Sequence, residues 1–155
     1  MFEYFLEELA TGLPDSRQSA QVIIRLTAAT LLGALMGFQR EKAGKPAGLR
    51  THMLVTIGTT VFILSCSLAG MSMEGLSRVI QGIITGIGFI GAGSILKLTE
   101  DRDIQGLTTS AGIWMAAAVG VAVGLGSLVV ALLATLVALV ILAVVPLEPR
   151  NGEDD

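Results

Sequence analysis

The sequence predicts an all-α, polytopic membrane protein with about five transmembrane helices. Two observations lead to this prediction. Hydrophobic residues make up 52% of the 155-residue chain and charged residues only 15%, which is an unusual balance for a soluble domain. In addition, the stretch from Ile104 to Leu147 contains no Asp, Glu, Lys, Arg or His. Because a helix needs about 20 apolar residues to cross a bilayer, this stretch is long enough for two spans.

The spans follow one another along the chain. The first is apolar apart from Arg25, the second and third are uncharged, and Gly124 to Ser127 separates the last two. The expected spans are 21–38, 53–69, 79–96, 106–123 and 127–145. Together they form a membrane domain at 20–146, which is followed by a short tail at 147–155.

The segment 1–17 is expected to be an interfacial helix, because Phe2, Phe5, Leu6 and Leu9 recur at helical spacing. The distribution of Lys and Arg sets the orientation, since short cytoplasmic loops are enriched in them. With the N-terminus outside, the outer segments hold only Arg17 and Arg78. The inner segments then hold Arg40, Lys42, Lys45, Arg50, Lys97, Arg102 and Arg150.

Two similar motifs suggest an internal repeat. Gly48 to Thr51 and Gly106 to Thr109 both open a span from the inner side after a glycine-bearing span and a short charged loop. We interpret them as a possible direct repeat of two helical hairpins, to which a fifth helix is added. Chance similarity in a chain of this composition is the alternative.

The stretch GIGFIGAG at 86–93 contains the spacing G-x-G-x-x-G, which also occurs in dinucleotide-binding loops. That reading requires a strand before it and a helix after it, whereas 79–96 is a run of membrane length. A helix in lipid with many small residues favours close packing against other helices or, alternatively, a kink that borders a polar cavity. The packing candidates are Gly82, Gly86, Gly88, Gly91 and Gly93.

The cytoplasmic face carries the other candidate residues. The loop 39–50 is basic, which either fixes the topology or attracts lipid headgroups, phosphate or an acidic partner. Arg40 or Arg50 is expected to pair with Glu100, Asp101 or Asp103 in the second inner loop. The candidates at this face are Arg40, Gly48, Arg50, Thr51, His52, Asp103, Thr108 and Thr109.

Two ionisable residues lie in or next to the spans. Arg25 either extends its side chain to the outer interface or faces the bundle and binds carbonyl groups. His52 is expected to be a hydrogen-bonded histidine at the inner end of a helix, because no cysteine or acid stands at a spacing suited to a shared metal.

The expected spans contain no carboxylate, which disfavours a dehydrated Mg²⁺ site at the middle of the membrane. Hydroxyl and amide side chains, such as those of Thr56, Thr59, Thr60, Gln81 and Thr85, either line a polar path or bond neighbouring helices. No base accompanies a nucleophile such as Cys66, so the sequence predicts neither an enzyme nor a cofactor or metal site. Nothing in it points to nucleic acid. Membrane lipid and further copies of the chain, packed through the glycine faces, are the expected partners.

Three motifs in this order and spacing resemble the MgtC/SapB family of bacterial inner-membrane proteins: AGLRTH at 47–52, GIGFIGAG at 86–93, and GLTTSA at 106–111 with Trp114. The resemblance implies a role in growth under magnesium limitation or membrane-energy stress. It also implies action on partner membrane machinery, including the F-type ATP synthase, rather than transport of Mg²⁺. A transporter or channel for a small ion is the alternative.

The chain departs from the family pattern in two places. Family members commonly have an acid immediately before the arginine at the end of the first helix, where this chain has Gln39, with Glu41 on the other side of Arg40. The larger relatives also carry a cytosolic C-terminal domain, and this chain is expected to be a short member that lacks it. The virulence role of the family is therefore not assigned to this chain.

Overall fold

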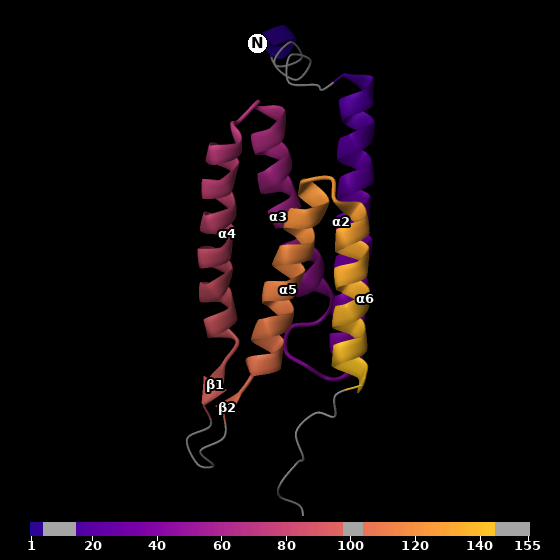
Figure 1. The fold of residues 1–155 in the computed structure, drawn as a ribbon, viewed down its shortest axis with the longest axis vertical. Coiled ribbons are helices and arrows are strands. Elements are labelled where there is room, and N and C mark those ends of the chain that lie inside the picture. Colours follow the sequence, from indigo (N-terminus) through magenta and orange to yellow (C-terminus); the bar gives the residue numbers. More distant parts are fainter. Residues whose placement is uncertain (5–14, 98–103, 145–155) are drawn as a thin grey trace, which may run out of the picture.

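The protein is a bundle of long helices, as the sequence predicts (Figure 1). The computed structural model describes residues 1–4, 15–97 and 104–144. Within them, four helices are long and apolar enough to cross a membrane, and α6 is a shorter apolar helix. The elements are α2 (Ser16–Lys42), α3 (Leu49–Leu68), α4 (Met73–Gly93), β1 (Leu96–Lys97), β2 (Ile104–Gln105), α5 (Leu107–Gly124) and α6 (Leu128–Val144). The all-α membrane fold class is therefore confirmed.

Successive helices run in opposite directions, so the connections gather at two ends (Figure 1). The loop between α2 and α3 and the two-stranded ribbon lie at one end, which we call the ribbon end. The turns from α3 to α4 and from α5 to α6 lie at the other, which we call the turn end. The ribbon end is the one expected to be cytoplasmic, and the orientation in the membrane stays a prediction.

The short ribbon between α4 and α5 is a feature that sequence patterns did not predict. Leu96 pairs with Gln105 and Lys97 with Ile104 in antiparallel register. Gly106 then turns the chain into α5 with a φ of +97°, which is a left-handed conformation that favours glycine. A Cβ atom at this position would also collide with the carbonyl oxygen of Ser94. The glycine is thus required both by its dihedral angle and by its neighbour.

Polar side chains fix where the helices begin. Asp15 accepts a hydrogen bond from the backbone N–H of Gln18 at 2.7 Å and so caps α2. At the start of α3, the carboxylate of Glu41 accepts from the N–H of Leu49 at 2.8 Å. Glu41 thus satisfies a free donor of the next helix.

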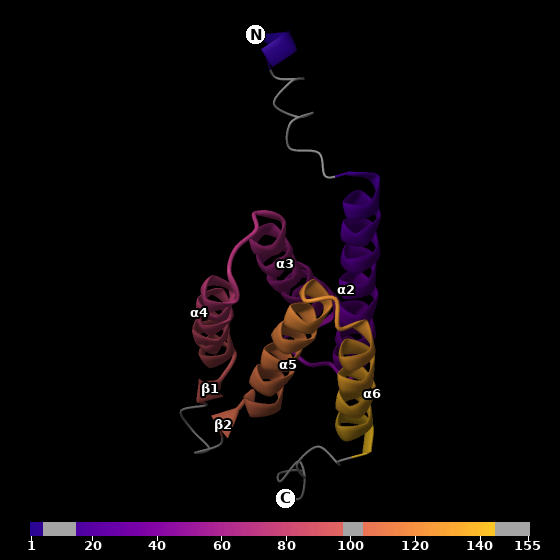
Figure 2. The ribbon, with the colours of Figure 1, turned by 45° about the horizontal axis from the view of Figure 1, so that its top comes forward.

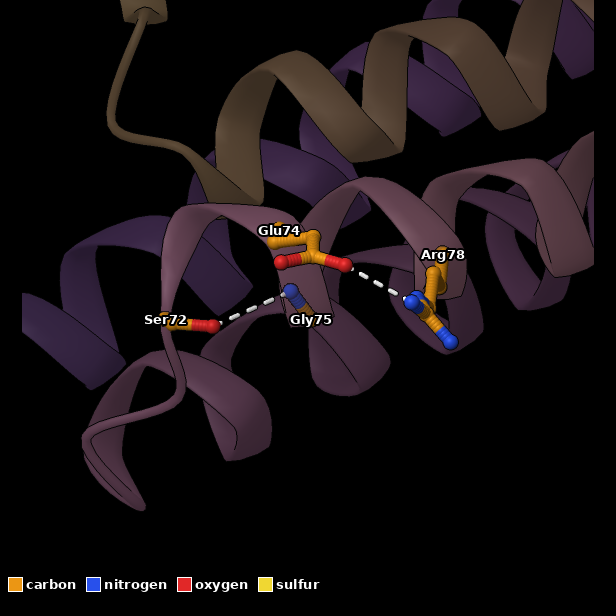
Figure 3. A network of polar contacts seen from close by, with 4 residues as sticks. All are labelled: Ser72, Glu74, Gly75 and Arg78. Atoms are coloured by element: carbon orange, nitrogen blue, oxygen red, sulfur yellow. Dashed lines mark hydrogen bonds and ion pairs between the residues drawn. The ribbon is translucent and has the colours of Figure 1, made fainter.

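The helix α4 begins before the expected third span. Ser72 caps it by accepting from the N–H of Gly75 at 3.2 Å, and Glu74 pairs with Arg78 at 2.7 Å (Figure 3). These contacts stabilise a polar first turn that a search for uncharged runs leaves out. At its other end, α4 stops at Gly93, and Leu96 belongs to the ribbon.

The centre of the bundle is the contact of α3 with α5, where glycines let the two backbones approach closely. A Cβ atom on Gly120 would collide with Thr59 and with the carbonyl group of Thr56, and one on Gly124 would lie 2.6 Å from Cβ of Ile63. Close approach at small residues is the usual way in which helices associate in lipid. The hydroxyl of Thr60 also donates to the carbonyl of Gly120 at 2.8 Å. This contact therefore combines packing with a buried hydrogen bond.

The helix α2 packs on α3 by the same means, and the contacts resemble those of the second hairpin. A Cβ atom on Gly33 would lie 2.9 Å from the carbonyl oxygen of His52, and one on Gly91 would lie 2.6 Å from Oγ of Ser110. Gly33 and Gly91, like His52 and Ser110, have the same offset as Gly48 and Gly106. Matched positions in two hairpins are what a direct repeat predicts.

The helix α4 stands at one side of the bundle (Figure 2). It contacts α5 more than α3, and an apolar groove with a volume of about 650 Å³ separates it from α3. Leu54, Val55, Phe62, Ile83 and Ile87 are among the side chains that line this groove. Much of the surface of α4 is therefore not covered by the other residues that the structure describes.

Candidate functional site: a buried polar centre at the ribbon end

The last turn of α2 places a positive charge inside the bundle. The side chain of Arg40 is only 1% exposed, and its Nη2 donates to the hydroxyl oxygen of Thr109 at 3.1 Å. Its Nε has no hydrogen-bond partner among the residues that the structure describes. A buried charge is costly unless it is paired, so this arginine is the strongest candidate for a functional residue.

His52 lies in the first turn of α3 and is fully buried. Its Nδ1 is 2.9 Å from the carbonyl oxygen of Gly48. Because a carbonyl oxygen can only accept, Nδ1 carries the proton, and in the neutral ring Nε2 then offers a lone pair. Gly112 leaves room for the ring, since a Cβ atom there would lie 3.3 Å from Nε2.

We call Arg40, His52 and Thr109 the polar centre. It joins three helices, α2, α3 and α5, at the ribbon end. Nε of Arg40 is a donor and Nε2 of His52 an acceptor, and neither has a partner within the described part of the chain. The centre thus holds one unsatisfied donor and one unsatisfied acceptor inside the bundle.

The other candidates at this end lie outside the polar centre. Arg50 and Thr51 line a small surface hollow of about 300 Å³, together with Gly48, Glu41 and Lys45. Thr108 is exposed, one position before the buried Thr109. The structure thus separates the buried Arg40 from the charged residues Lys45 and Arg50 at this hollow, which we call the basic rim. The expected pairing of Arg40 or Arg50 with acids of the second inner loop stays a prediction, because Glu100, Asp101 and Asp103 lie outside the described residues.

At the turn end, Arg25 faces the bundle. Its Nη1 donates to the carbonyl oxygen of Gly124 at 2.8 Å, at the C-terminus of α5. A cation at this position satisfies a free carbonyl and interacts favourably with the helix dipole. This is the second of the two alternatives that the sequence left open.

The glycines of α4 do not form one packing face. Gly91 contacts Ser110 on α5, whereas a Cβ atom on Gly82, Gly86, Gly88 or Gly93 would meet nothing within 4 Å. Gly82 and Gly86 line the groove between α3 and α4. A role of these glycines in helix packing therefore stays a prediction that requires a partner from outside the described chain, apart from Gly91.

The structure also identifies residues that the sequence did not single out. Gly112, Gly120 and Gly124 pack against α3, and their spacing along α5 was the available signal. Gln39, which replaces the acid of the family pattern, donates from Nε2 to the carbonyl oxygen of Leu142 at 3.1 Å. No feature of the sequence indicated this contact with α6.

Metal-binding side chains do not cluster in the described part of the chain, where no group of three or more His, Cys, Asp or Glu could hold an ion. Three threonines of α3 are buried, Thr56 against Gly33 of α2, and Thr59 and Thr60 against Gly120 of α5. Thr56 and Thr59 donate to carbonyl groups of their own helix, and Thr60 donates to Gly120. Their hydroxyls therefore lie at the contacts of α3 with α2 and with α5.

The sequence matches known proteins over the same helices. The model of the MgtC family matches residues 26–148. Protein MgtC of Salmonella typhimurium strain LT2 is 44% identical over 117 residues, which cover 76% of this chain and 49% of the relative. The protein named "Putative magnesium transporter YhiD" of Escherichia coli strain K12 is 37% identical over 133 residues, which cover 81% of this chain and 61% of the relative.

Protein SrpB of Synechococcus elongatus is 40% identical over 115 residues, covering 66% of this chain and 62% of the relative. The chain spans about half the length of the MgtC proteins it matches. No solved structure matches it.

Proposed function

The chain belongs to the MgtC family, and on this basis we propose that it supports bacterial growth when magnesium is scarce. In this proposal it is a multi-pass protein of the inner membrane, with its ribbon end in the cytoplasm, and it acts on partner membrane machinery. The F-type ATP synthase is one such partner. The chain neither catalyses a reaction nor carries Mg²⁺ itself.

The buried guanidinium of Arg40 is the observation that carries this proposal. A positive charge fixed inside the bundle repels a divalent cation, in the way that an arginine in a pore excludes cations. Arg25 adds a second positive charge at the turn end, and it is held by a carbonyl group of α5. Transport of Mg²⁺ through the bundle would have to pass both charges.

The threonines support the same conclusion. A conducting path needs oxygen atoms that can replace the water around an ion. Thr56 and Thr60 are fully buried, and their hydroxyls donate to carbonyls at the contacts of α3 with α2 and with α5 respectively. The name of the relative YhiD favours the alternative, in which the chain transports Mg²⁺ or another small solute.

Two measurements separate the proposal from this alternative. The purified chain is reconstituted in vesicles that contain a magnesium-sensitive dye, and we expect uptake no faster than in vesicles without protein. In parallel, the wild-type gene is expected to restore growth of a deletion strain in low-magnesium medium. Uptake clearly above the protein-free rate would overturn the regulator proposal and favour transport.

A pair of variants then locates the function. Arg40→Gln removes the buried charge, and Arg50→Gln removes an exposed charge of the basic rim. We expect Arg40→Gln to abolish growth in low magnesium at normal abundance in the membrane, and Arg17→Gln, at the opposite end, to have no effect. If Arg50→Gln alone abolishes growth, the basic rim rather than the polar centre carries the function.

A further inference from the structure

The groove between α3 and α4 has the size and the lining of a site for a hydrocarbon chain. Its volume of about 650 Å³ lies within the range of about 300–1,000 Å³ that is usual for small-molecule sites. Among the described residues that line it, Thr59 alone has a polar side chain, and its hydroxyl already donates to the carbonyl of Val55 at 2.9 Å. The lining therefore favours an apolar occupant.

The length of the groove matches one leaflet of a bilayer. Its walls run from Leu54 to Phe62 on α3 and from Val79 to Ile90 on α4. At 1.5 Å per residue, these stretches are about 12–17 Å long. The hydrocarbon core of a bilayer is about 30 Å thick, so one leaflet contributes about 15 Å. An acyl chain that enters from one membrane surface can therefore lie along the whole groove.

A helix of another protein fits the groove less well than an acyl chain. A helix is about 10 Å across, so a piece of it about 15 Å long occupies more than about 1,000 Å³. The groove can thus receive side chains of such a helix but not the helix itself. Gly58 on one wall and Gly82 and Gly86 on the other keep the groove open, since a Cβ atom on any of them would meet nothing within 4 Å.

At the ribbon end, the groove adjoins the hollow that carries the basic rim. Thr51 lines the hollow, and Gly58, seven residues later on α3, lines the groove. Residues seven positions apart lie on the same face of a helix, about 10 Å from one another along its axis. In addition, Ala47 of the loop beside the hollow packs in one cluster with Val55 and Ile87 of the groove. The hollow and the groove therefore follow one another along α3.

The basic rim supplies a charge that attracts an anionic headgroup. Arg50 is exposed and Lys45 is half-buried at the hollow. Glu41 also lines the hollow, and its carboxylate accepts from the N–H of Leu49 at 2.8 Å. Two cations against one carboxylate leave the hollow with a net positive charge. Lys and Arg residues next to a membrane surface attract anionic lipids in this way.

We propose that the chain binds one anionic phospholipid, with its phosphate at the basic rim and one acyl chain in the groove between α3 and α4. The guanidinium of Arg50 can donate two hydrogen bonds to phosphate oxygens, and the ammonium group of Lys45 contributes a point charge. The hydroxyl of Thr51 is a further donor. This site requires only that the ribbon end lie at a membrane surface, so it depends neither on the orientation of the chain nor on the proposed function.

Native mass spectrometry of the purified chain in detergent tests the headgroup contact. It measures the dissociation constants of phosphatidylglycerol and of phosphatidylcholine with the same acyl chains, and we expect the anionic lipid to bind more tightly. Arg50→Gln should weaken the binding of phosphatidylglycerol about fivefold, the effect of one Lys or Arg at a membrane surface, and leave phosphatidylcholine unchanged. Arg17→Gln, at the opposite end, is the control. Equal constants for the two lipids, or equal effects of the two variants, would overturn the proposal.

Filling the groove tests the place of the acyl chain. Gly86→Leu puts a side chain into the groove from α4, and Gly58→Leu does so from α3. Gly88→Leu is the matched control, because its Cβ atom also meets nothing within 4 Å but Gly88 does not line the groove. We expect both groove variants to lose bound lipid of either kind and the control to retain it. Thermal unfolding identifies the variants that fold, and retention of lipid by a folded groove variant would refute the site.

A tryptophan reporter locates the lipid in vesicles. Trp114→Phe removes the only tryptophan of the chain, and Leu54→Trp then places one in the groove. Val140→Trp, on the exposed surface of α6 close to the ribbon end, is the control. Phosphatidylglycerol brominated in its acyl chains should quench Leu54→Trp more than an equal amount of brominated phosphatidylcholine. The same ratio of quenching at both reporters would contradict a site in the groove.

Two other occupants would each overturn the proposal. If Gly86→Leu converts dimers of the chain into monomers in the native mass spectra without loss of lipid, the groove holds a second copy. If inorganic phosphate displaces phosphatidylglycerol at the concentration at which it binds alone, the headgroup is the whole ligand and the groove holds none of it. Both results are independent of the growth and uptake measurements, so the lipid site can fail while the proposed function stands.

Discussion

Arg40 on α2 donates a hydrogen bond to Thr109 on α5 across 3.1 Å, and both side chains are buried. The two residues come from the two hairpins, so this single bond joins them at the ribbon end. The sequence placed both among the candidates, and it also predicts a pairing of Arg40 or Arg50 with carboxylates of the second inner loop, which lie outside the described residues.

The first prediction concerns the acceptor. Thr109→Val keeps the shape of the side chain and leaves Nη2 of Arg40 without its bond. Loss of a buried partner of a charged group costs about 1–3 kcal/mol. We expect a lower midpoint of thermal unfolding for the purified protein in detergent. Thr108→Val, one position earlier and exposed, should change the midpoint little. Equal effects of the two variants would contradict a special role of Thr109.

The second prediction concerns the close contact of α3 with α5. Gly120→Ala places a methyl group against Thr59 and the backbone of Thr56. Overpacking of this kind costs about 1–3 kcal/mol. Gly82→Ala is the matched control, because its methyl group meets nothing within 4 Å and alanine favours a helix. The midpoint of thermal unfolding should therefore fall for Gly120→Ala and stay unchanged for Gly82→Ala. An unchanged midpoint for Gly120→Ala would show that α3 and α5 can move apart without loss of stability.

The third prediction concerns the turn before α5. Gly106→Ala puts a side chain at a φ of +97° and against the carbonyl of Ser94. The left-handed conformation alone should destabilise the variant by about 1–2 kcal/mol, and we expect the collision to add to this loss. Gly44→Ala, at a φ of +66° with open space around it, should lose stability only through the unfavourable backbone conformation. Circular dichroism on heating compares the two, and a larger loss for Gly44→Ala would refute the role of Ser94.

The fourth prediction concerns the C-terminus of α5. Arg25→Gln removes the positive charge near the carbonyl of Gly124. A cation in this position contributes about 0.3–1 kcal/mol, and up to about 2 kcal/mol when it is partly buried. Arg25→Lys should keep part of that stabilisation, and Arg17→Gln, which is exposed at the start of α2, should keep all of it. If Arg25→Gln unfolds at the same temperature as the wild type, the hydrogen bond of Arg25 to α5 makes no net contribution to stability.

The sequence predicted the helices because the requirement for a membrane-length apolar run leaves few choices. It could not predict which face of each helix points inward, because lipid is as apolar as a protein core and hydrophobic spacing no longer distinguishes the two. Gly82 and Gly120 cannot be distinguished from the sequence, because each is a glycine within an apolar helix. Only their neighbours show that the first borders a groove and the second touches α3.

The polar centre was predicted in part for a related reason. Arg40 and His52 stood out because charged and titratable residues are rare near the spans. Their partners depend on how α2, α3 and α5 are rotated about their axes, and spacing along one helix does not determine this rotation. The bond of Gln39 to Leu142 is a further example, since its acceptor is a backbone carbonyl that every residue possesses.

Arg25 lies in the N-terminal half of α2 and Gln39 in its last turn, and each donates to a carbonyl near the C-terminal end of another helix. Aliphatic surfaces can slide past one another along the membrane normal with little change in energy. A donor that must reach one particular carbonyl cannot. Arg25 thereby fixes the height of α5, and Gln39 fixes the height of α6, relative to α2. The height of Thr109 on α5 relative to Arg40 on α2 is thus held by a hydrogen bond to the backbone at the other end of the bundle.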